Sequence, residues 1–204
     1  MDVSMLYGNR CEACRSRARV LCITCRTELF AMAQPECESA VVAVAYEGIA
    51  RRLILNLKYH NRRQVVTVLA ELLARRISLH TACMETVVDV VTWAPTSAAR
   101  IRRRGHDQSE LLARRLAKKM HVPCRRLLIK TSTNVQTGLP RQQRLRGSVF
   151  SARKLGVNSH VMVVDDVVTS GTTMQCAATA LRNAGALEVT CVAVAYALRH
   201  DLRR

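Results

Sequence analysis

The sequence predicts an α/β fold, a parallel β-sheet with helices on both of its faces. The main observation is an alternation of strand-like and helix-like segments from about Val87 to the end of the chain. The strand-like segments are apolar at consecutive positions, as expected for strands that are buried on both faces. With 204 residues, of which 49% are hydrophobic, the chain can bury the core of one domain and carry a small appendage.

Three zones follow one another along the chain. Residues 1–37 hold five of the nine cysteines and show little amphipathic pattern. Residues 38–204 form the main domain, with a helical N-terminal part over residues 38–80 and a core over residues 81–204. In the helical part we expect a strand over Ala40–Tyr46 and helices over Ile49–Leu57 and Gln64–Ile77.

The core residues continue the alternation. Gly185 stands where the last helix should end, since glycine is favoured just past a helix C-terminus. Regular patterning fades between Lys130 and Ser159, which predicts a long loop, usually a functional or disordered feature. The expected strands are Val87–Trp93, Leu127–Ile129, Val161–Val164 and Val189–Ala197, and the expected helices are Gln108–Met120 and Thr173–Ala184.

The segment after strand Val161–Val164 predicts a sugar-phosphate site. Asp165 and Asp166 follow the strand directly, and the turn Thr169–Thr173 supplies four hydroxyls and one glycine before a helix. Ligands of parallel sheets bind beyond the carboxyl ends of the strands, and a helix N-terminus favours a phosphate. The two carboxylates would accept hydrogen bonds from vicinal ribose hydroxyls. The alternative is an ordinary capped helix after a strand; a Walker A loop is excluded because the segment contains no lysine.

Two CxxC pairs predict a structural zinc site near the N-terminus. Cys11 and Cys14 are followed after seven residues by Cys22 and Cys25, and four thiolates complete a tetrahedral site without an open position. Cys37 could replace one of these ligands, and redox-active pairs or unligated thiols are the competing interpretations. Small core residues are expected at the remaining cysteines, Cys83, Cys124, Cys176 and Cys191.

The charge of +17 at pH 7 is unevenly distributed. Fourteen Lys and Arg residues but only two acids lie between Ala99 and Arg146. Such a field attracts polyanions such as pyrophosphate, nucleotides or nucleic acid, and a solvated basic surface is the plain alternative. The arginine cluster lies between a strand end and a helix start, where it can neutralise a pyrophosphate leaving group or grip a nucleic-acid backbone. It consists of Arg100, Arg102, Arg103 and Arg104.

Composition also bears on location and on binding mode. No apolar run approaches the ~20 residues that span a bilayer, and the N-terminus lacks the basic and apolar regions of a signal peptide. We therefore expect a soluble, cytoplasmic protein without membrane insertion, in which an odd number of cysteines fits free thiols and a metal site. With two Phe, four Tyr and one Trp, stacking of bases on an aromatic platform is not expected as the main activity.

Landmarks over nearly the whole chain resemble the ComF/GntX family, the competence-associated phosphoribosyltransferase-like proteins. In family order, they are the four-cysteine motif, Tyr46-Glu47-Gly48, Leu57-Lys58-Tyr59, Arg104-Gly105, Gln108-Ser109-Glu110-Leu111, Gln136-Thr137-Gly138-Leu139 with Arg141 and Arg144, and the sugar-phosphate motif. Two stretches depart from the family pattern near the expected pyrophosphate loop. Trp93-Ala94-Pro95 replaces Pro-Val-Pro, and Arg104-Gly105-His106-Asp107-Gln108 replaces Arg-Gly-Phe-Asn-Gln.

The resemblance implies a type I phosphoribosyltransferase-like core with a small N-terminal zinc ribbon. It implies that Asp165 and Asp166 bind the ribose hydroxyls at the catalytic centre, and that phosphoribosyl pyrophosphate is bound with Mg²⁺. The segment Thr131–Gly147 resembles the mobile loop that closes over such sites and excludes water. By the same resemblance the 5-phosphate is bound by Val168, Thr169, Ser170, Gly171, Thr172 and Thr173.

Three hypotheses for function follow. In the first, a nucleophile displaces pyrophosphate at ribose C1 while Mg²⁺ and the arginines Arg100, Arg103 and Arg104 balance the leaving charge, in a protein that acts in DNA uptake. The sequence does not indicate the acceptor. In the second, the protein handles single-stranded DNA and keeps the sugar-phosphate pocket for regulation. In the third, the zinc ribbon is an adaptor for a competence helicase or translocase, with the core as scaffold.

Overall fold

The computed structural model of the chain describes residues 10–81, 87–131, 149–156 and 159–197. Its main sheet has four strands in the order β1-β6-β5-β2, and all neighbouring pairs are parallel. The strands are β1 (Val41–Ala45), β2 (Val90–Trp93), β5 (Ser159–Val168) and β6 (Ala186–Tyr196). The α/β fold with a parallel sheet is confirmed.

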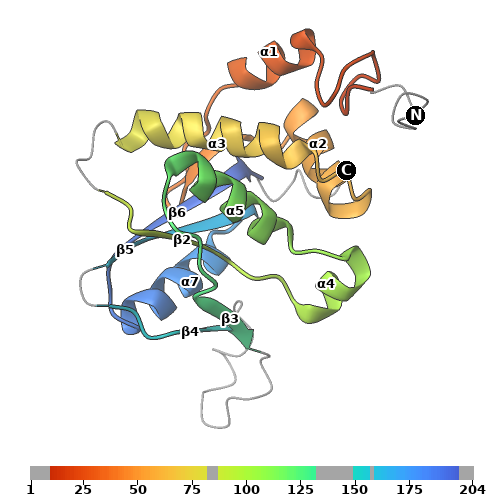
Figure 1. Cartoon of the computed structure of the whole chain (residues 1–204). Helices are drawn as coiled ribbons and strands as arrows, with labels where there is room; N and C mark the ends of the chain where they lie inside the picture. The colour runs from red at the N-terminus through yellow and green to blue at the C-terminus, as the bar shows by residue number, and fades with distance from the viewer. Residues whose placement is uncertain (1–9, 82–86, 132–148, 157–158, 198–204) are drawn as a thin grey trace.

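Helices cover both faces of this sheet (Figure 1). On β5, Met162 and Val164 pack into the apolar cluster of α3 and α5, whereas Val161 and Val163 pack into the cluster of α7. This alternation follows from the two-residue period of a strand, and it explains why the strand is apolar at consecutive positions. One face carries α2 (Gly48–Tyr59), α3 (Val65–Thr81) and α5 (Gln108–Met120), and the other carries α7 (Thr172–Asn183) with a small hairpin, β3 (Leu128–Thr131) and β4 (Val149–Ala152).

β5 is longer than its apolar run predicts. Its pairing with β6 continues through Asp165, Val167 and Val168, so the acid pair lies within the strand and not after it. Gly185 follows the C-cap of α7 with φ +106°, as predicted for a residue just past a helix.

Three elements escaped the sequence prediction. α1 (Ile23–Ala31) and α4 (Ala98–Arg104) lack a clear apolar face, and α4 has no buried residue. Strand β4 lies in the stretch where regular patterning fades, and it pairs antiparallel with β3. These elements are held by capping and by contact with neighbours, which hydrophobic periodicity does not report. The predicted mobile-loop residues 132–147 and Cys83 lie outside the described residues.

The N-terminal four-cysteine segment (residues 10–37, called the ribbon below) is attached through a buried carboxylate to α2 and to Gln64, the residue before α3. Glu12 is 4% exposed, and its side chain accepts hydrogen bonds from Asn56 Nδ2 at 3.1 Å and Gln64 Nε2 at 2.6 Å. Asn56 also donates to the Glu12 backbone oxygen at 2.9 Å, and α1 contacts α2. β1, in the zone predicted to be mainly helical, completes the edge of the main sheet beside β6. Over the described ranges, no helix is long and apolar enough to cross a bilayer.

Candidate functional site

The turn between β5 and α7 brings the predicted phosphate-binding residues together. Val168 ends β5 and is buried, and residues 169–171 lead into the twelve-residue helix α7. The hydroxyls of Ser170 and Thr172 are 3.0 Å apart. Several hydroxyls and the first N–H groups of a helix are thus gathered in one turn, an environment that favours a phosphate dianion.

Gly171 is required in this turn for two reasons. It is the N-cap residue of α7 with φ +74°, a left-handed conformation that other residues adopt at a cost. A Cβ atom at this position would also lie 2.3 Å from Ser39 Oγ and 2.5 Å from Ser39 Cβ. The segment that leads from the N-terminal ribbon into β1 therefore packs directly against the turn of residues 168–173, the candidate phosphate turn.

The acid pair of Asp165 and Asp166 lies at the carboxyl end of β5, immediately before this turn. Asp165 Oδ1 accepts hydrogen bonds from Ser109 Oγ at 2.7 Å and from the Asp166 backbone N–H at 2.8 Å. Burial and then the charge of Asp166 raise the pKa of Asp165 to about 7, against the lowering effect of these hydrogen bonds and of Lys58. Near neutral pH this carboxyl is therefore divided between its two protonation states.

Asp166 is paired with Lys58 of α2. The two atoms Lys58 Nζ and Asp166 Oδ2 are 3.1 Å apart, and the side chains are 16% and 6% exposed. The contact is an ion pair and not a well-aligned hydrogen bond. Burial is the largest single effect and would lower the pKa of Lys58, but the contact with Asp166 and the charges of Asp166, Asp165 and Tyr46 together outweigh it and raise the pKa, which keeps the lysine charged.

A third carboxylate, Asp107, joins the site to the loop after β2. Its Oδ1 accepts the Ser109 N–H at 3.1 Å as the N-cap of α5, and its Oδ2 accepts the Thr96 N–H at 2.9 Å. Burial raises the pKa of Asp107 although these backbone hydrogen bonds oppose the change. Asp107 thereby fixes the loop of residues 94–97 against the start of α5, beside the residue that bonds Asp165.

The arginine cluster lies on α4 and not on an irregular segment. Ser97 caps this helix by accepting the Arg100 N–H at 3.4 Å, and Gly105 ends it with φ +75°. Arg100 and Arg103 are exposed, whereas Arg104 is half-buried with its guanidinium 5.1 Å from the Tyr59 ring centre. The assignment of Arg100, Arg103 and Arg104 to pyrophosphate stays a prediction.

Two lysines of the site were not identified from the sequence. Lys58 belongs to a family landmark, but no pattern in the sequence connects it with Asp166, 108 positions later. Lys130 of β3 is half-buried; burial and the charge of Arg100 lower its pKa, whereas Asp165 and Asp107 raise it. Both residues come from elements that only the tertiary structure brings to the carboxyl end of β5.

The four cysteines of the two CxxC pairs form one cluster. The sulfur atoms of Cys11, Cys14, Cys22 and Cys25 all lie within 4.8 Å of one another, and those of Cys14 and Cys22 are 3.6 Å apart. A tetrahedral zinc ion with Zn–S bonds of ~2.3 Å has sulfur–sulfur edges of ~3.8 Å. The donor set and its dimensions therefore fit a structural zinc ion.

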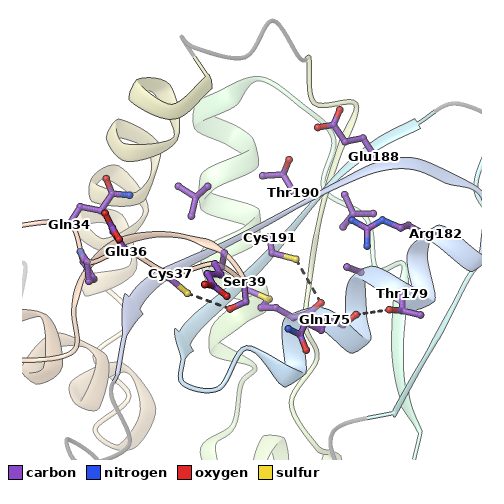
Figure 2. Close-up of a pocket in the computed structure, with 17 residues that line it drawn as sticks. Gln34, Glu36, Cys37, Ser39, Gln175, Thr179, Arg182, Glu188, Thr190 and Cys191 are labelled. Atoms are coloured by element: carbon purple, nitrogen blue, oxygen red, sulfur yellow. Dashed lines mark hydrogen bonds between the residues drawn. The ribbon is translucent and has the colours of Figure 1, made fainter.

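Cys37 lies away from this cluster. It lines a hollow of about 1010 Å³ formed by residues 34–41, the outer side of α7 and the first half of β6 (Figure 2). There its sulfur is 3.4 Å from Ser39 Oγ, and it does not belong to the cluster of four sulfur atoms, so the expectation that Cys37 could replace a zinc ligand is wrong. Three of the cysteines predicted to be core residues (Cys124, Cys176 and Cys191) are only half-buried.

Comparison with known families identifies the class of protein. A sequence profile of the phosphoribosyl transferase domain matches residues 101–203, just over half of the chain. The chain therefore belongs to the phosphoribosyltransferase family, and its fold is that of the type I enzymes, as expected. The matched region contains the acid pair, the phosphate turn and most of the arginine cluster, whereas the ribbon precedes it.

Several solved structures are also similar to the chain. An adenine phosphoribosyltransferase is 16% identical with a TM-score of 0.48, over 87% of this chain and 92% of that one. The glutamine phosphoribosylpyrophosphate amidotransferase of B. subtilis is 25% identical with a TM-score of 0.44; the match covers 64% of this chain but 26% of the amidotransferase. A hypoxanthine phosphoribosyl transferase of Trypanosoma cruzi is 15% identical with a TM-score of 0.38, over 64% of each chain. No curated protein matches the sequence significantly.

Proposed function

We propose that the protein binds phosphoribosyl pyrophosphate as its magnesium complex and transfers the phosphoribosyl group to a nucleophilic acceptor. One observation carries this proposal: the acid pair lies near the carboxyl end of β5, and this strand leads directly into the turn of residues 168–173, which contains the left-handed Gly171. Acids beside a phosphate site are useful when the ligand also presents hydroxyl groups, and a sugar phosphate presents both. The family match supports the same ligand.

Each part of the site has a role in this reaction. The turn of residues 168–173 binds the 5-phosphate, and Asp165 and Asp166 accept hydrogen bonds from the ribose hydroxyls. Arg100 and Lys130, with the backbone of residues 94–97, face the pyrophosphate. The acceptor's lone pair forms the new bond to C1 while the C1–O bond breaks, pyrophosphate leaves with the electron pair, and the acceptor's proton passes to pyrophosphate or solvent. Fixed cations favour this step because negative charge develops on the leaving group.

Zinc would stabilise the ribbon rather than take part in the chemistry. The four thiolates leave no open coordination position. The ribbon also supports α2 through Glu12, whose partner Asn56 lies two residues before Lys58. A zinc ion held by Cys11, Cys14, Cys22 and Cys25 would therefore keep α2, and with it the ion pair to Asp166, in place.

The biological assignment extends this proposal. The landmarks shared with ComF/GntX proteins support membership of that branch and a role in DNA uptake during natural competence. A second candidate function is binding of single-stranded DNA, alone or with a competence helicase or translocase. It is favoured by the exposure of Arg100, Arg102 and Arg103 on one short helix.

Calorimetric titration with phosphoribosyl pyrophosphate and Mg²⁺ tests the proposed ligand. We expect micromolar binding by the zinc-loaded protein and a loss of at least tenfold in the double variant Asp165→Asn/Asp166→Asn. Asp89→Asn is the matched control, because this exposed carboxylate bonds the N–H of His160 near the other end of β5. Equal affinity of the double variant and the intact protein would refute the assignment of the acid pair. Absence of binding by the intact protein would refute the proposed function.

A further inference from the structure

Cations lie on two sides of the acid pair, and the pyrophosphate leaving group explains the cations on only one side. Lys130 of β3 and Arg100 of α4 influence each other's charge and lie near Asp165 and Asp107. Lys58, in contrast, comes from α2, on the opposite face of the sheet from the hairpin of β3 (Figure 1). A sugar ring held by the acid pair would therefore have a positive charge both toward β3 and toward α2.

Lys58 is a costly residue to place where it is. Its side chain is only 16% exposed, and a buried ammonium is stable only with a partner. Its partner is Asp166, in an ion pair at 3.1 Å, and an ammonium group has three N–H donors. When ribose hydroxyls bind to the oxygens of Asp166, Lys58 is the cation next to the ribose ring on the side facing α2. It can therefore contact the group that binds on this side.

The surroundings of Lys58 are aromatic as well as positive. Of the four tyrosines of the chain, Tyr46 is close enough to Lys58 for their charges to interact. Tyr59 follows Lys58 on α2, and its charge acts on Tyr46. Burial raises the pKa of Tyr46, against the charges of Lys58 and Arg51, so its hydroxyl stays protonated and can donate a hydrogen bond. Tyr59 is 56% exposed, and Arg104 lies against its ring with Nη2 3.5 Å from the hydroxyl.

We propose that the acceptor is a planar anion, a heteroaromatic acid whose carboxylate is recognised by Lys58 and whose ring packs at Tyr59. This inference rests on the proposed function and adds the chemical class of the second substrate. A neutral base would offer the Lys58 ammonium no charged partner beyond the acid pair, whereas a carboxylate would accept a charge-assisted hydrogen bond from it. The protonated Tyr46 hydroxyl can donate to the same carboxylate. Lys58 is thus a specificity residue on the acceptor side of the site.

Matched pairs of nucleoside monophosphates test the acceptor class without needing turnover. Nicotinate and nicotinamide mononucleotide differ by a carboxylate against a carboxamide, and orotidine and uridine 5′-monophosphate differ by one carboxylate. All four carry ribose 5-phosphate, so its contribution cancels within each pair. In calorimetric titrations we expect the acid of each pair to bind about ten- to a hundredfold more tightly, as for a charged hydrogen bond.

Two variants separate recognition from a purely structural ion pair. Lys58→Met should bring the affinity ratio of each pair close to one, even if it weakens both members by leaving Asp166 unpaired, and Lys58→Arg should keep most of the ratio. Lys130→Met is the matched control on the other side, expected to weaken phosphoribosyl pyrophosphate binding but to leave the ratio unchanged. If the intact protein binds ribose 5-phosphate but shows an affinity ratio near one, or if Lys58→Met leaves the affinity ratio unchanged, this inference is overturned while the proposed function stands. If ribose 5-phosphate itself does not bind, the proposed function is overturned and this inference with it.

Discussion

Replacing Asp165 by Asn should stabilise the protein increasingly as the pH rises. The pKa of Asp165 is raised from its ordinary value of 3.8 to about 7, mainly by burial and the charge of Asp166. Because the folded-state pKa lies above the unfolded one, the associated stability is complete below about pH 4 and is lost as the pH rises through 7. Asparagine carries no charge and does not incur this loss.

The size of the effect follows from the difference of about three pKa units. At 1.36 kcal/mol per unit, the ionised carboxylate costs the fold ~4 kcal/mol well above pH 7, and about 2 kcal/mol of this develops between pH 5.5 and pH 8. In Asp165→Asn the free energy of unfolding, relative to the intact protein, should thus rise by about 2 kcal/mol over this range. For a chain of this size, that corresponds to a shift in Tm of roughly 4–8 °C.

Urea denaturation of both proteins at several pH values measures this difference. Glu110→Gln is the control for loss of a carboxylate, since Glu110 forms a half-exposed pair with Arg114 at 2.8 Å and should contribute about 0.5 kcal/mol or less. A stability difference for Asp165→Asn that stays flat or falls between pH 5.5 and pH 8 would refute the argument from burial. It would show that the partners of Asp165 compensate fully for its desolvation.

Three further predictions concern the turn, the ribbon and the arginine cluster. Gly171→Ala should lower the free energy of unfolding, measured in urea, by about 2–4 kcal/mol, because of the left-handed φ and the clash with Ser39. Adding Ser39→Gly in a double variant should recover the part due to the clash; no recovery would exclude that clash as a cause. Cys14→Ser should lose the zinc ion counted by metal analysis, whereas Cys37→Ser should keep one zinc per chain; equal zinc contents would contradict the four-sulfur site. Changing the three exposed arginines of α4 (Arg100, Arg102 and Arg103) to glutamine should weaken the salt dependence of single-stranded DNA binding. The slope of log affinity against log salt concentration should fall in magnitude by ~0.7 for each DNA phosphate that is no longer neutralised, and an unchanged slope would place the DNA surface elsewhere.

Much of the candidate site could be predicted because its residues are consecutive in the sequence. Asp165, Asp166 and the turn up to Thr173 form one strand–turn–helix unit, whose geometry is set by local preferences and by the left-handed Gly171. The four cysteines of the ribbon are likewise close in sequence. In both cases short chain segments leave few arrangements for the functional groups, so spacing alone is informative.

What surrounds these residues was decided by tertiary structure. Ser39 reaches Gly171, Ser109 reaches Asp165, and Lys58 reaches Asp166 across large separations in the sequence. A single sequence carries no signal for such contacts, because they depend on how α2 and α5 pack over the sheet and on where β1 enters it. The raised pKa of Asp165 has the same origin.

The sequence by itself therefore determined the α/β class, the turn between β5 and α7 with the acid pair before it, and the cysteine cluster, since each depends on local spacing and on alternation of apolar residues. The tertiary structure alone decided the length of β5, the helical arrangement of the arginine cluster and the presence of Lys58 and Lys130 beside the acids. The physical reason is that a buried charge is defined by its partners, and partners distant in the sequence meet only when the layers of the fold pack together.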